Sequence, residues 1–350
     1  MPRNRKISGV FLLCERFLYL LGIYGSFMTG DFYEKSDIDL MIVINDERGW
    51  KVGCTFIQDD LQVGHDIYCT TWEHLQNDAK YEHPNLSKLM DSKIVYCAEK
   101  KYEEQLNALR KKARDILEAP FSEEDYAKAE KLLKEAERYY AQTMISENKS
   151  DVLSGAGGAV YYIESALAML NKQYFHYGTK RVYEELTALK NRPERLCGMI
   201  ENVISASTAA AVKEHLTILM KETMGTFRQV KETVTEPKKT VEAEMLNGTY
   251  EEMYSNWRNK MYEAAVLENR HLAFMSLISA ETMFSEIADI ADIDNYDVLG
   301  EYDPKDLHKT AKAYDAVLKE YLKEYKKAGI QMKHYLDIDA FLREYLKDNR

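Results

Sequence analysis

The strand-forming segments of this sequence all fall within its first hundred residues. Three short runs rich in β-branched and aromatic residues occur there: Asp39–Ile44, Gly64–Cys69 and Lys93–Tyr96. After Glu99 the strand pattern stops, and apolar residues recur at helical spacing. The sequence therefore predicts an α+β fold, with a small mixed-sheet head over residues 1–99 and a large all-α helical bundle over residues 100–350. A division of the bundle into two helical subdomains near 237–249 is left open.

The composition is that of a globular protein with an acidic surface. Of its 350 residues 45% are apolar and 30% charged, and the formal net charge is −11. A surface of this sign repels phosphate backbones, which argues against binding to long nucleic acid and favours a cationic small molecule. The five cysteines are scattered without a C-x-x-C pair, so neither a zinc site nor a disulfide framework is predicted.

The N-terminal segment superficially has the layout of a signal peptide. However, Glu15 and Arg16 interrupt its apolar run, so the pattern fits an amphipathic helix over Gly9–Leu21 better. No window approaches the roughly 20 apolar residues of a membrane span. We therefore expect a cytoplasmic protein that does not interact with membranes.

Two aspartates stand at the start of the first strand, behind a loop that begins at a glycine. Gly25-Ser26 follows an apolar stretch, and a glycine there lets backbone N–H groups approach an anion closely. Asp37 and Asp39 are two residues apart, so on a strand they point to one side while Ile38 points to the core. Carboxylates this close repel each other unless a cation lies between them, and Mg²⁺ takes one or two carboxylates plus substrate phosphates. The pattern predicts a site for a magnesium nucleotide.

A third carboxylate, Asp66, lies in the next strand-like run. If that strand pairs beside the first, Asp66 can complete a metal triad or take a proton from an attacking hydroxyl. Asp59-Asp60 is a rival that better fits a solvated turn. Two further Asp-x-Asp pairs, Asp292-Ile-Asp294 and Asp337-Ile-Asp339, lack an upstream Gly-Ser at the right distance and a following apolar strand. They fit loop or helix-cap acids.

These residues resemble the signature of the DNA polymerase β-like nucleotidyltransferase superfamily: Gly-Ser or Gly-Gly, a loop, Asp-x-Asp, and a later strand carboxylate. Within it, the chain is similar to the minimal and the aminoglycoside (kanamycin/lincosamide) type, a nucleotidyltransferase head followed by a helical domain. The resemblance covers roughly residues 20–97. It implies two Mg²⁺ ions and ATP or another nucleoside triphosphate as substrate. The residues it assigns are Gly25 and Ser26 to the triphosphate, Asp37 and Asp39 to metal, and Asp66 as the third metal-binding and catalytic carboxylate.

The sequence departs from the family pattern after the Gly-Ser pair. Many relatives carry a basic residue there, where this chain has Phe27-Met28-Thr29. Lys35, together with its neighbour Ser36 at the end of the loop, is the nearest candidate to contact the nucleotide. The helical body is the other possible source of positive charge.

The helical body contains a second, weaker resemblance. The segment from Tyr161 to Arg181 is similar to the helix and basic segment of the partner domain in these enzymes. That resemblance implies Glu164 as a general base and Lys180 as a phosphate contact. The plainer interpretation is a packed helix acid at Glu164, and a helix terminus stabilised by Lys180 and Arg181.

Together these features predict an enzyme that moves a nucleoside monophosphate, AMP from ATP, to a hydroxyl of a small molecule, for which an aminoglycoside-like antibiotic is a candidate. Two alternatives stay open: an antitoxin-like protein adenylyltransferase, and a nucleotide-binding protein without turnover. A helical ribonuclease body is disfavoured, because no histidine follows an arginine at the spacing such domains use. A homodimer is also open, since some relatives build the site across a dimer.

Overall fold

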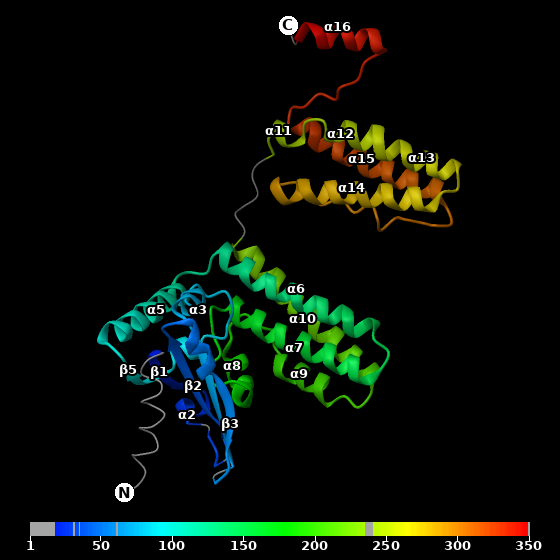
Figure 1. Ribbon diagram of the computed structural model, residues 1–350. Helices are drawn as coiled ribbons and strands as arrows, with labels where there is room; N and C mark the ends of the chain where they lie inside the picture. Colours follow the sequence, from blue (N-terminus) through cyan, green and yellow to red (C-terminus); the bar gives the residue numbers. More distant parts are fainter. Residues whose placement is uncertain (1–17, 31, 35, 61, 235–240, 349–350) are drawn as a thin grey trace. The chain divides into compact units, whose positions relative to one another are not determined.

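Five strands form one mixed sheet in the N-terminal part of the chain (Figure 1). The structure is a computed structural model that describes residues 18–30, 32–34, 36–60, 62–234 and 241–348. Packing divides the chain into two units, residues 1–235 and residues 236–350, and each unit is described by itself.

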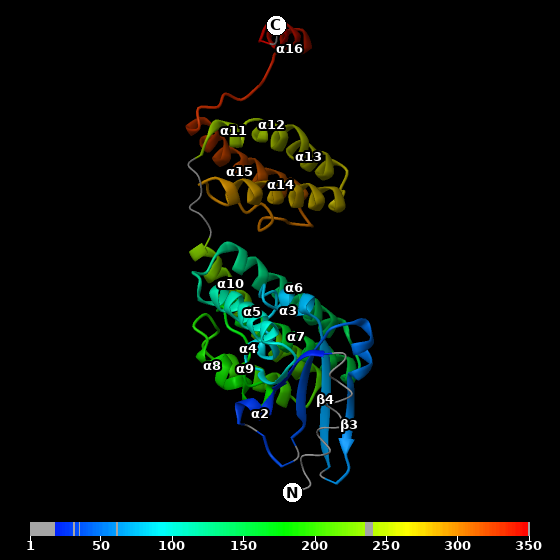
Figure 2. The same cartoon turned by 60° about the vertical axis from the view of Figure 1, so that its left-hand side comes forward.

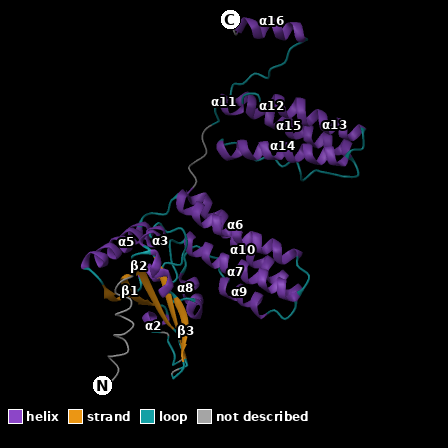
Figure 3. Cartoon of the chain, viewed as in Figure 1, coloured by secondary structure: helices purple, strands orange, loops and turns teal. Residues whose placement is uncertain are grey.

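The sheet has the strand order β3-β4-β2-β1-β5. Its strands are β1 (Leu18–Tyr24), β2 (Ile38–Ile44), β3 (Cys54–Gln58), β4 (Val63–Thr70) and β5 (Lys93–Cys97). β2 and β4 run parallel, and the other neighbours are antiparallel. Figure 2 shows β3 and β4 side by side at one edge, and Figure 3 shows that the strands precede a largely helical remainder. The predicted α+β class is confirmed.

The side chains of β2 alternate between two cores. Met41 and Val43 are fully buried in the main core, together with Leu20 of β1. Ile42 and Ile44 belong to a smaller cluster on the other face. Because strand residues two apart share a face, Asp39 lies on the same face as Met41, the side of the main core.

Helices of the first unit extend the main core beyond the sheet. The longer ones are α3 (Trp72–Asp78), α5 (Lys100–Glu118), α6 (Glu123–Ile145), α7 (Lys149–Leu170), α8 (Val182–Ala188), α9 (Leu196–Ser205) and α10 (Ala209–Val234). The shorter ones are α2 (Ser26–Thr29), η1 (Glu47–Val52), α4 (Ser87–Met90) and η2 (Thr179–Arg181). Buried residues from Leu20 to Val230 form one continuous core. The predicted domain boundaries, 1–99 and 100–350, stay predictions.

Helices α6 and α7 pack closely because α7 carries small residues toward α6. A Cβ added at Gly155 would overlap Thr143, and one added at Gly158 would overlap the ring of Tyr139. α6 begins at the N-cap Ser122, whose hydroxyl and backbone form a capping box with Asp125. The close packing of α7 against α6 fixes the position of α7, and with it that of Glu164.

The second unit is helical throughout its described regular elements. These are α11 (Ala243–Leu246), α12 (Thr249–Glu252), a π-helix η3 (Met253–Arg258), α13 (Asn259–Val266), α14 (Arg270–Ile290), α15 (Leu307–Lys327) and α16 (Ile338–Asp348). Its core contains the buried tyrosines Tyr314, Tyr321 and Tyr325. Within it, Arg258 pairs with Asp315 at 2.5 Å.

One expectation about the N-terminus is wrong. The predicted helix Gly9–Leu21 overlaps β1, because Leu18–Leu21 is strand, and the rest of that segment lies outside the described residues. A short apolar run does not distinguish a strand from a helix. Here the run is a strand because it pairs with β2 and β5. Among the described helices, none is both long and apolar enough to cross a membrane.

Candidate active site

Four neighbouring strands bring four polar side chains into one row across the sheet. Asp39 of β2 pairs with Asp66 of β4 on one side and with Tyr24 of β1 on the other. Asp66 pairs in turn with Thr55 of β3, whose hydroxyl donates a 3.1 Å hydrogen bond to Asp66 Oδ1. Residues paired across strands share a face, so the two aspartates lie side by side. We call Tyr24, Asp39, Asp66 and Thr55 the polar row.

Asp37 joins the polar row from the residue before β2. It is two positions from Asp39, and a Cβ added at Gly64 of β4 would lie 3.5 Å from Asp37 Cβ. The carboxylates influence one another: burial is the largest cause that raises the pKa of Asp39, and the charges of Asp37 and Asp66 follow. The structure therefore brings the three predicted acids to one face of the sheet.

Tyr24 closes the row on the side of β1. Burial and the nearby charge of Asp39 raise the pKa of the Tyr24 hydroxyl well above its usual value. The hydroxyl therefore stays neutral near pH 7 and keeps its proton as a donor.

The turn after β1 is shaped around the carboxylate of Asp39. Gly25 has φ 72° and ψ −154°, a backbone conformation that favours glycine. A Cβ added there would overlap Asp39 Oδ2. A glycine at this position thus meets two requirements at once, a left-handed φ and room for the acid.

The serine hydroxyls of the segment between β1 and β2 differ in their hydrogen bonds. Ser26 Oγ is buried and has no hydrogen-bond partner, although a buried hydroxyl normally has one. Ser36 Oγ accepts a 2.9 Å hydrogen bond from the backbone N–H of Tyr33, and its own proton is not committed to that bond. Lys35 lies outside the described residues. Ser26 is therefore the loop residue with the clearest unmet hydrogen-bonding capacity.

The residues of the polar row fit a hard divalent cation in their chemistry. Among the described residues, no three His, Cys, Asp or Glu side chains are already arranged as a metal site. Mg²⁺, however, is commonly held by one or two carboxylates, with phosphates and waters completing its shell. Asp37, Asp39 and Asp66 supply carboxylate oxygens on one face, and a cation would relieve their mutual repulsion.

Lys88 of α4 is a cation beside the row that no sequence motif identifies. Its Nζ lies 3.5 Å from the ring centroid of Tyr68 and 5.7 Å from that of Tyr24. Burial lowers the pKa of Lys88, while the carboxylates of Asp78, Asp66 and Asp39 raise it. Its position depends on tertiary packing, so only the folded structure shows that it belongs to this region.

Glu164 and Lys180, the two predicted residues of the helical body, line one cavity. This cavity has a volume of about 500 Å³. Its wall also includes Asn85, Tyr161, Phe175 and Tyr183. Burial raises the pKa of Glu164 to about 7. The structure thus places these two residues of one segment, Glu164 on α7 and Lys180 on η2, on the wall of the same cavity.

Two contacts connect the cavity lined by Glu164 and Lys180 to the sheet-bearing part of this unit. Lys180 Nζ lies 5.3 Å from the ring centroid of Tyr33, which belongs to the loop between Ser26 and Asp37. Asn85 Nδ2 donates a 3.0 Å hydrogen bond to the hydroxyl of Tyr161. The cavity therefore borders both the loop of the polar row and the segment that leads to Lys88.

The segment 173–177, which leads to Lys180, is held by residues of the head. Tyr81 donates its hydroxyl proton to Gln173 O at 2.7 Å, and the N–H of Phe175 donates to Pro84 O at 3.0 Å. Asp91 adds two contacts: its Oδ1 accepts a hydrogen bond from the hydroxyl of Tyr174 at 2.9 Å, and its Oδ2 lies 3.2 Å from Nδ1 of His176.

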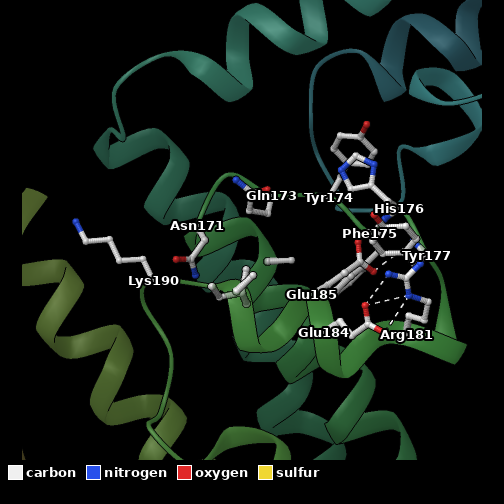
Figure 4. A pocket seen from close by; sticks show the side chains of 13 residues that line it. Asn171, Gln173, Tyr174, Phe175, His176, Tyr177, Arg181, Glu184, Glu185 and Lys190 are labelled. Carbon is white, nitrogen blue, oxygen red and sulfur yellow. Dashed lines mark hydrogen bonds and ion pairs between the residues drawn. The ribbon is translucent and has the colours of Figure 1, made fainter. Parts of the chain in front are cut away.

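A second cavity, of about 490 Å³, lies along this segment (Figure 4). Two glutamates of its wall form hydrogen bonds or an ion pair with other residues of the wall. Glu185 accepts a hydrogen bond from the backbone N–H of His176 at 2.6 Å, and Arg181 pairs with Glu184 at 2.6 Å. These contacts order the segment that carries Lys180.

The N-terminal part of the chain matches a known domain family. The family model described as "Nucleotidyltransferase domain" matches residues 12–140. No curated protein matches the chain. Among solved structures, a nucleotidyltransferase-like protein from Exiguobacterium sibiricum 255-15 is similar at 12% identity, with a TM-score of 0.36, over 82% of this chain and 90% of that chain. A TM-score this low carries no argument about function.

The family match includes the polar row, Asp37 and the turn at Gly25. Residues 12–140 of this chain are therefore similar to nucleotidyltransferase domains.

Proposed function

We propose that this protein transfers AMP from ATP to a hydroxyl group of a small-molecule acceptor, with two Mg²⁺ ions held by Asp37, Asp39 and Asp66. The observation that carries the proposal is the pairing of Asp39 with Asp66 on one face of the sheet, directly beside the turn at Gly25. The match of residues 12–140 to nucleotidyltransferase domains supports the class of reaction.

The residues around the polar row would bind and orient the nucleotide. Bound Mg²⁺ would neutralise charge on the triphosphate and on the departing pyrophosphate. The tight turn at Gly25 lets phosphate approach the backbone, and the unpartnered hydroxyl of Ser26 can donate to a phosphate oxygen. The hydroxyl of Ser36 is a further donor from the same loop. Thr55 keeps the carboxylate of Asp66 in one orientation.

Glu164 is the proposed general base. In the transfer, the acceptor oxygen forms a bond to the α-phosphorus while the bond from that phosphorus to pyrophosphate breaks, and the hydroxyl proton passes to a carboxylate oxygen of Glu164. A pKa of about 7 suits this role, because the group is then a proton acceptor near neutral pH. Lys180, on the same cavity, would contact phosphate.

We propose that the acceptor binds in the cavity lined by Glu164 and Lys180, the acceptor cavity, whose dimensions favour a small acceptor. A volume of about 500 Å³ lies within the usual range of small-molecule sites, whereas a protein acceptor needs a much wider contact surface. The formal charge of −11 favours a cationic acceptor. An aminoglycoside-like antibiotic, which a kanamycin/lincosamide-type enzyme would modify, therefore belongs in the first panel of acceptors.

Pyrophosphate release from ATP tests the proposal. The purified protein is incubated with ATP, Mg²⁺ and a panel of aminoglycosides, lincosamides and smaller amino alcohols, beside Asp39→Asn and Asp59→Asn. Asp59 is a matched control, since it is an exposed aspartate of the turn between β3 and β4. We expect acceptor-dependent release that Asp39→Asn abolishes and Asp59→Asn retains. Equal release by Asp39→Asn and the wild type, or no release from any nucleotide with any acceptor, would contradict the proposal.

A further inference from the structure

The ammonium group of Lys88 has unused hydrogen-bonding capacity. The residue is partly buried, and no residue in the described part of the chain forms a hydrogen bond or an ion pair with it. Its neighbours at Nζ are the rings of Tyr68 and Tyr24, which stabilise a cation but do not take its three N–H donors as carboxylates would. A partly desolvated donor without an acceptor is unfavourable, and a ligand with acceptor oxygens would remove that cost.

The two rings place this ammonium on the face of the polar row. Tyr24 pairs with Asp39, and Tyr68 follows Asp66 by two residues on the same strand, so both rings share the face of the acids. The carboxylates of Asp66 and Asp39 act on Lys88 electrostatically without forming an ion pair with it. A counter-ion of the acids would contact them directly. Lys88 instead lies near the acids with its own donors free.

A ligand with several negative charges can bind both the cations held by the carboxylates and the ammonium group of Lys88. Divalent cations on the carboxylates would hold some of its oxygens, and the Lys88 ammonium would hold others through charge-assisted hydrogen bonds. A nucleoside triphosphate has this character, whereas a nucleoside monophosphate lacks the two phosphates beyond the reacting phosphorus that a second cation would hold.

We propose that Lys88 binds the β- and γ-phosphates of the nucleotide and supplies the positive charge that Phe27-Met28-Thr29 does not. This inference rests on the proposed function, since it takes the polar row as the nucleotide site. Lys88 would thus supply from the head the positive charge for which the sequence offered only Lys35 or the helical body. Lys88 also lies only three residues from Asn85, which lines the acceptor cavity.

Binding measurements on the full-length protein test this role without relying on turnover. Calorimetric titrations with α,β-methylene-ATP, inorganic pyrophosphate and AMP, each with Mg²⁺, are carried out on the wild type, Lys88→Met and Lys88→Arg. Lys93→Met is the matched control. Lys93 is an exposed lysine of β5 that pairs with Ile23 and therefore lies on the opposite face from Tyr24. Thermal melting shows whether each variant is folded, and Lys88→Gln replaces Lys88→Met if the latter is not.

We expect Lys88→Met to weaken binding of the ATP analogue and of pyrophosphate by about tenfold or more, the usual effect of removing a hydrogen bond to a charged group. Lys88→Arg should lose less, and AMP binding and the Lys93→Met variant should be unaffected. Wild-type affinity for the analogue in Lys88→Met would overturn the inference and leave the transferase proposal intact. Equal losses for AMP and the analogue would overturn the assignment to the β- and γ-phosphates. A wild type that binds pyrophosphate through Lys88 but transfers no AMP would instead contradict the proposed function alone.

Discussion

The carboxylate of Asp39 occupies the space that a side chain at Gly25 would need. A Cβ at that position would overlap Asp39 Oδ2, and the backbone there has the positive φ that favours glycine. Gly25 of the Gly-Ser pair, which follows β1, thus lies directly against Asp39 of the Asp-x-Asp pair in β2. This contact explains why the two motifs occur together, independently of any bound nucleotide.

Replacing Gly25 with alanine should therefore displace the Asp39 carboxylate. We expect Gly25→Ala to lower kcat/KM by about a hundredfold, the scale of loss when a reacting group is misplaced by about 1 Å. Initial rates of pyrophosphate release measure the effect.

Gly30→Ala is the control for backbone strain in this comparison. Gly30 also has a positive φ, of 77°, but nothing lies within 4 Å of the Cβ it would gain. It should cost stability only, about 1–2 kcal/mol for a left-handed residue with a side chain. Equal activity losses in the two variants would show that strain, rather than the contact with Asp39, is responsible.

The charge of Asp39 should destabilise the protein in the absence of metal. Burial and the charges of Asp37 and Asp66 raise the pKa of Asp39 above the value of an unfolded chain. The folded state therefore favours the protonated form, and stability is lost as pH rises from the ordinary pKa of an aspartate through the raised one. At pH 7.5 we expect Asp39→Asn to melt at a higher temperature than the wild type, while it loses activity.

Thermal melting with and without Mg²⁺ checks this expectation. Mg²⁺ with a nucleotide should raise the melting temperature of the wild type and have little effect on Asp39→Asn. A metal-free Asp39→Asn variant that melts below the wild type would contradict the destabilising role of that charge.

Much of the sheet could be predicted because β2, β4 and β5 are short runs rich in β-branched and aromatic residues, which favour strands. The placement of Asp37 and Asp39 on one side of a strand follows from their spacing alone. Their approach to Asp66 required a pairing partner that the pattern does not specify. The structure supplies it as a parallel register between β2 and β4.

The pH dependence of transfer should follow the ionisation of Glu164. Its pKa is raised to about 7 by burial, and a general base must be deprotonated. We therefore expect kcat to rise with pH through about 7 and to level off above it. Glu164→Gln should lower kcat and remove this ionisation from the profile, whereas Glu184→Gln, which alters an exposed glutamate paired with Arg181, should retain it. An unchanged pH profile in Glu164→Gln would exclude Glu164 as the base.

The contact between Asp91 and His176 should stabilise the protein most at low pH. The hydrogen bond to Asp91 is the main cause that raises the pKa of His176 above 6.5. This stabilisation is fully present below the pKa of the unfolded chain and is lost as pH rises through the raised value. Asp91→Asn should therefore lower the melting temperature more at pH 5.5 than at pH 8.5. An equal decrease at both pH values would show that the charge on His176 contributes nothing.

Other parts of the site could not be predicted, because tertiary packing alone creates them. β1 could not be predicted, since a short apolar run has no decisive period and only its pairing with β2 and β5 makes it a strand. Lys88 has no motif, and its role depends on rings from two strands. Glu164 could be selected from a resemblance, but its burial, which sets its pKa, is visible only in the fold.

A crystal structure with α,β-methylene-ATP and Mn²⁺ in place of Mg²⁺ tests the central claim most directly, because anomalous scattering locates the metal. We predict metal peaks bounded by the carboxylates of Asp37, Asp39 and Asp66, with the triphosphate against Gly25 and Ser26. A nucleotide bound elsewhere, or metal peaks away from these three carboxylates, would contradict the assignment of the polar row as the active site.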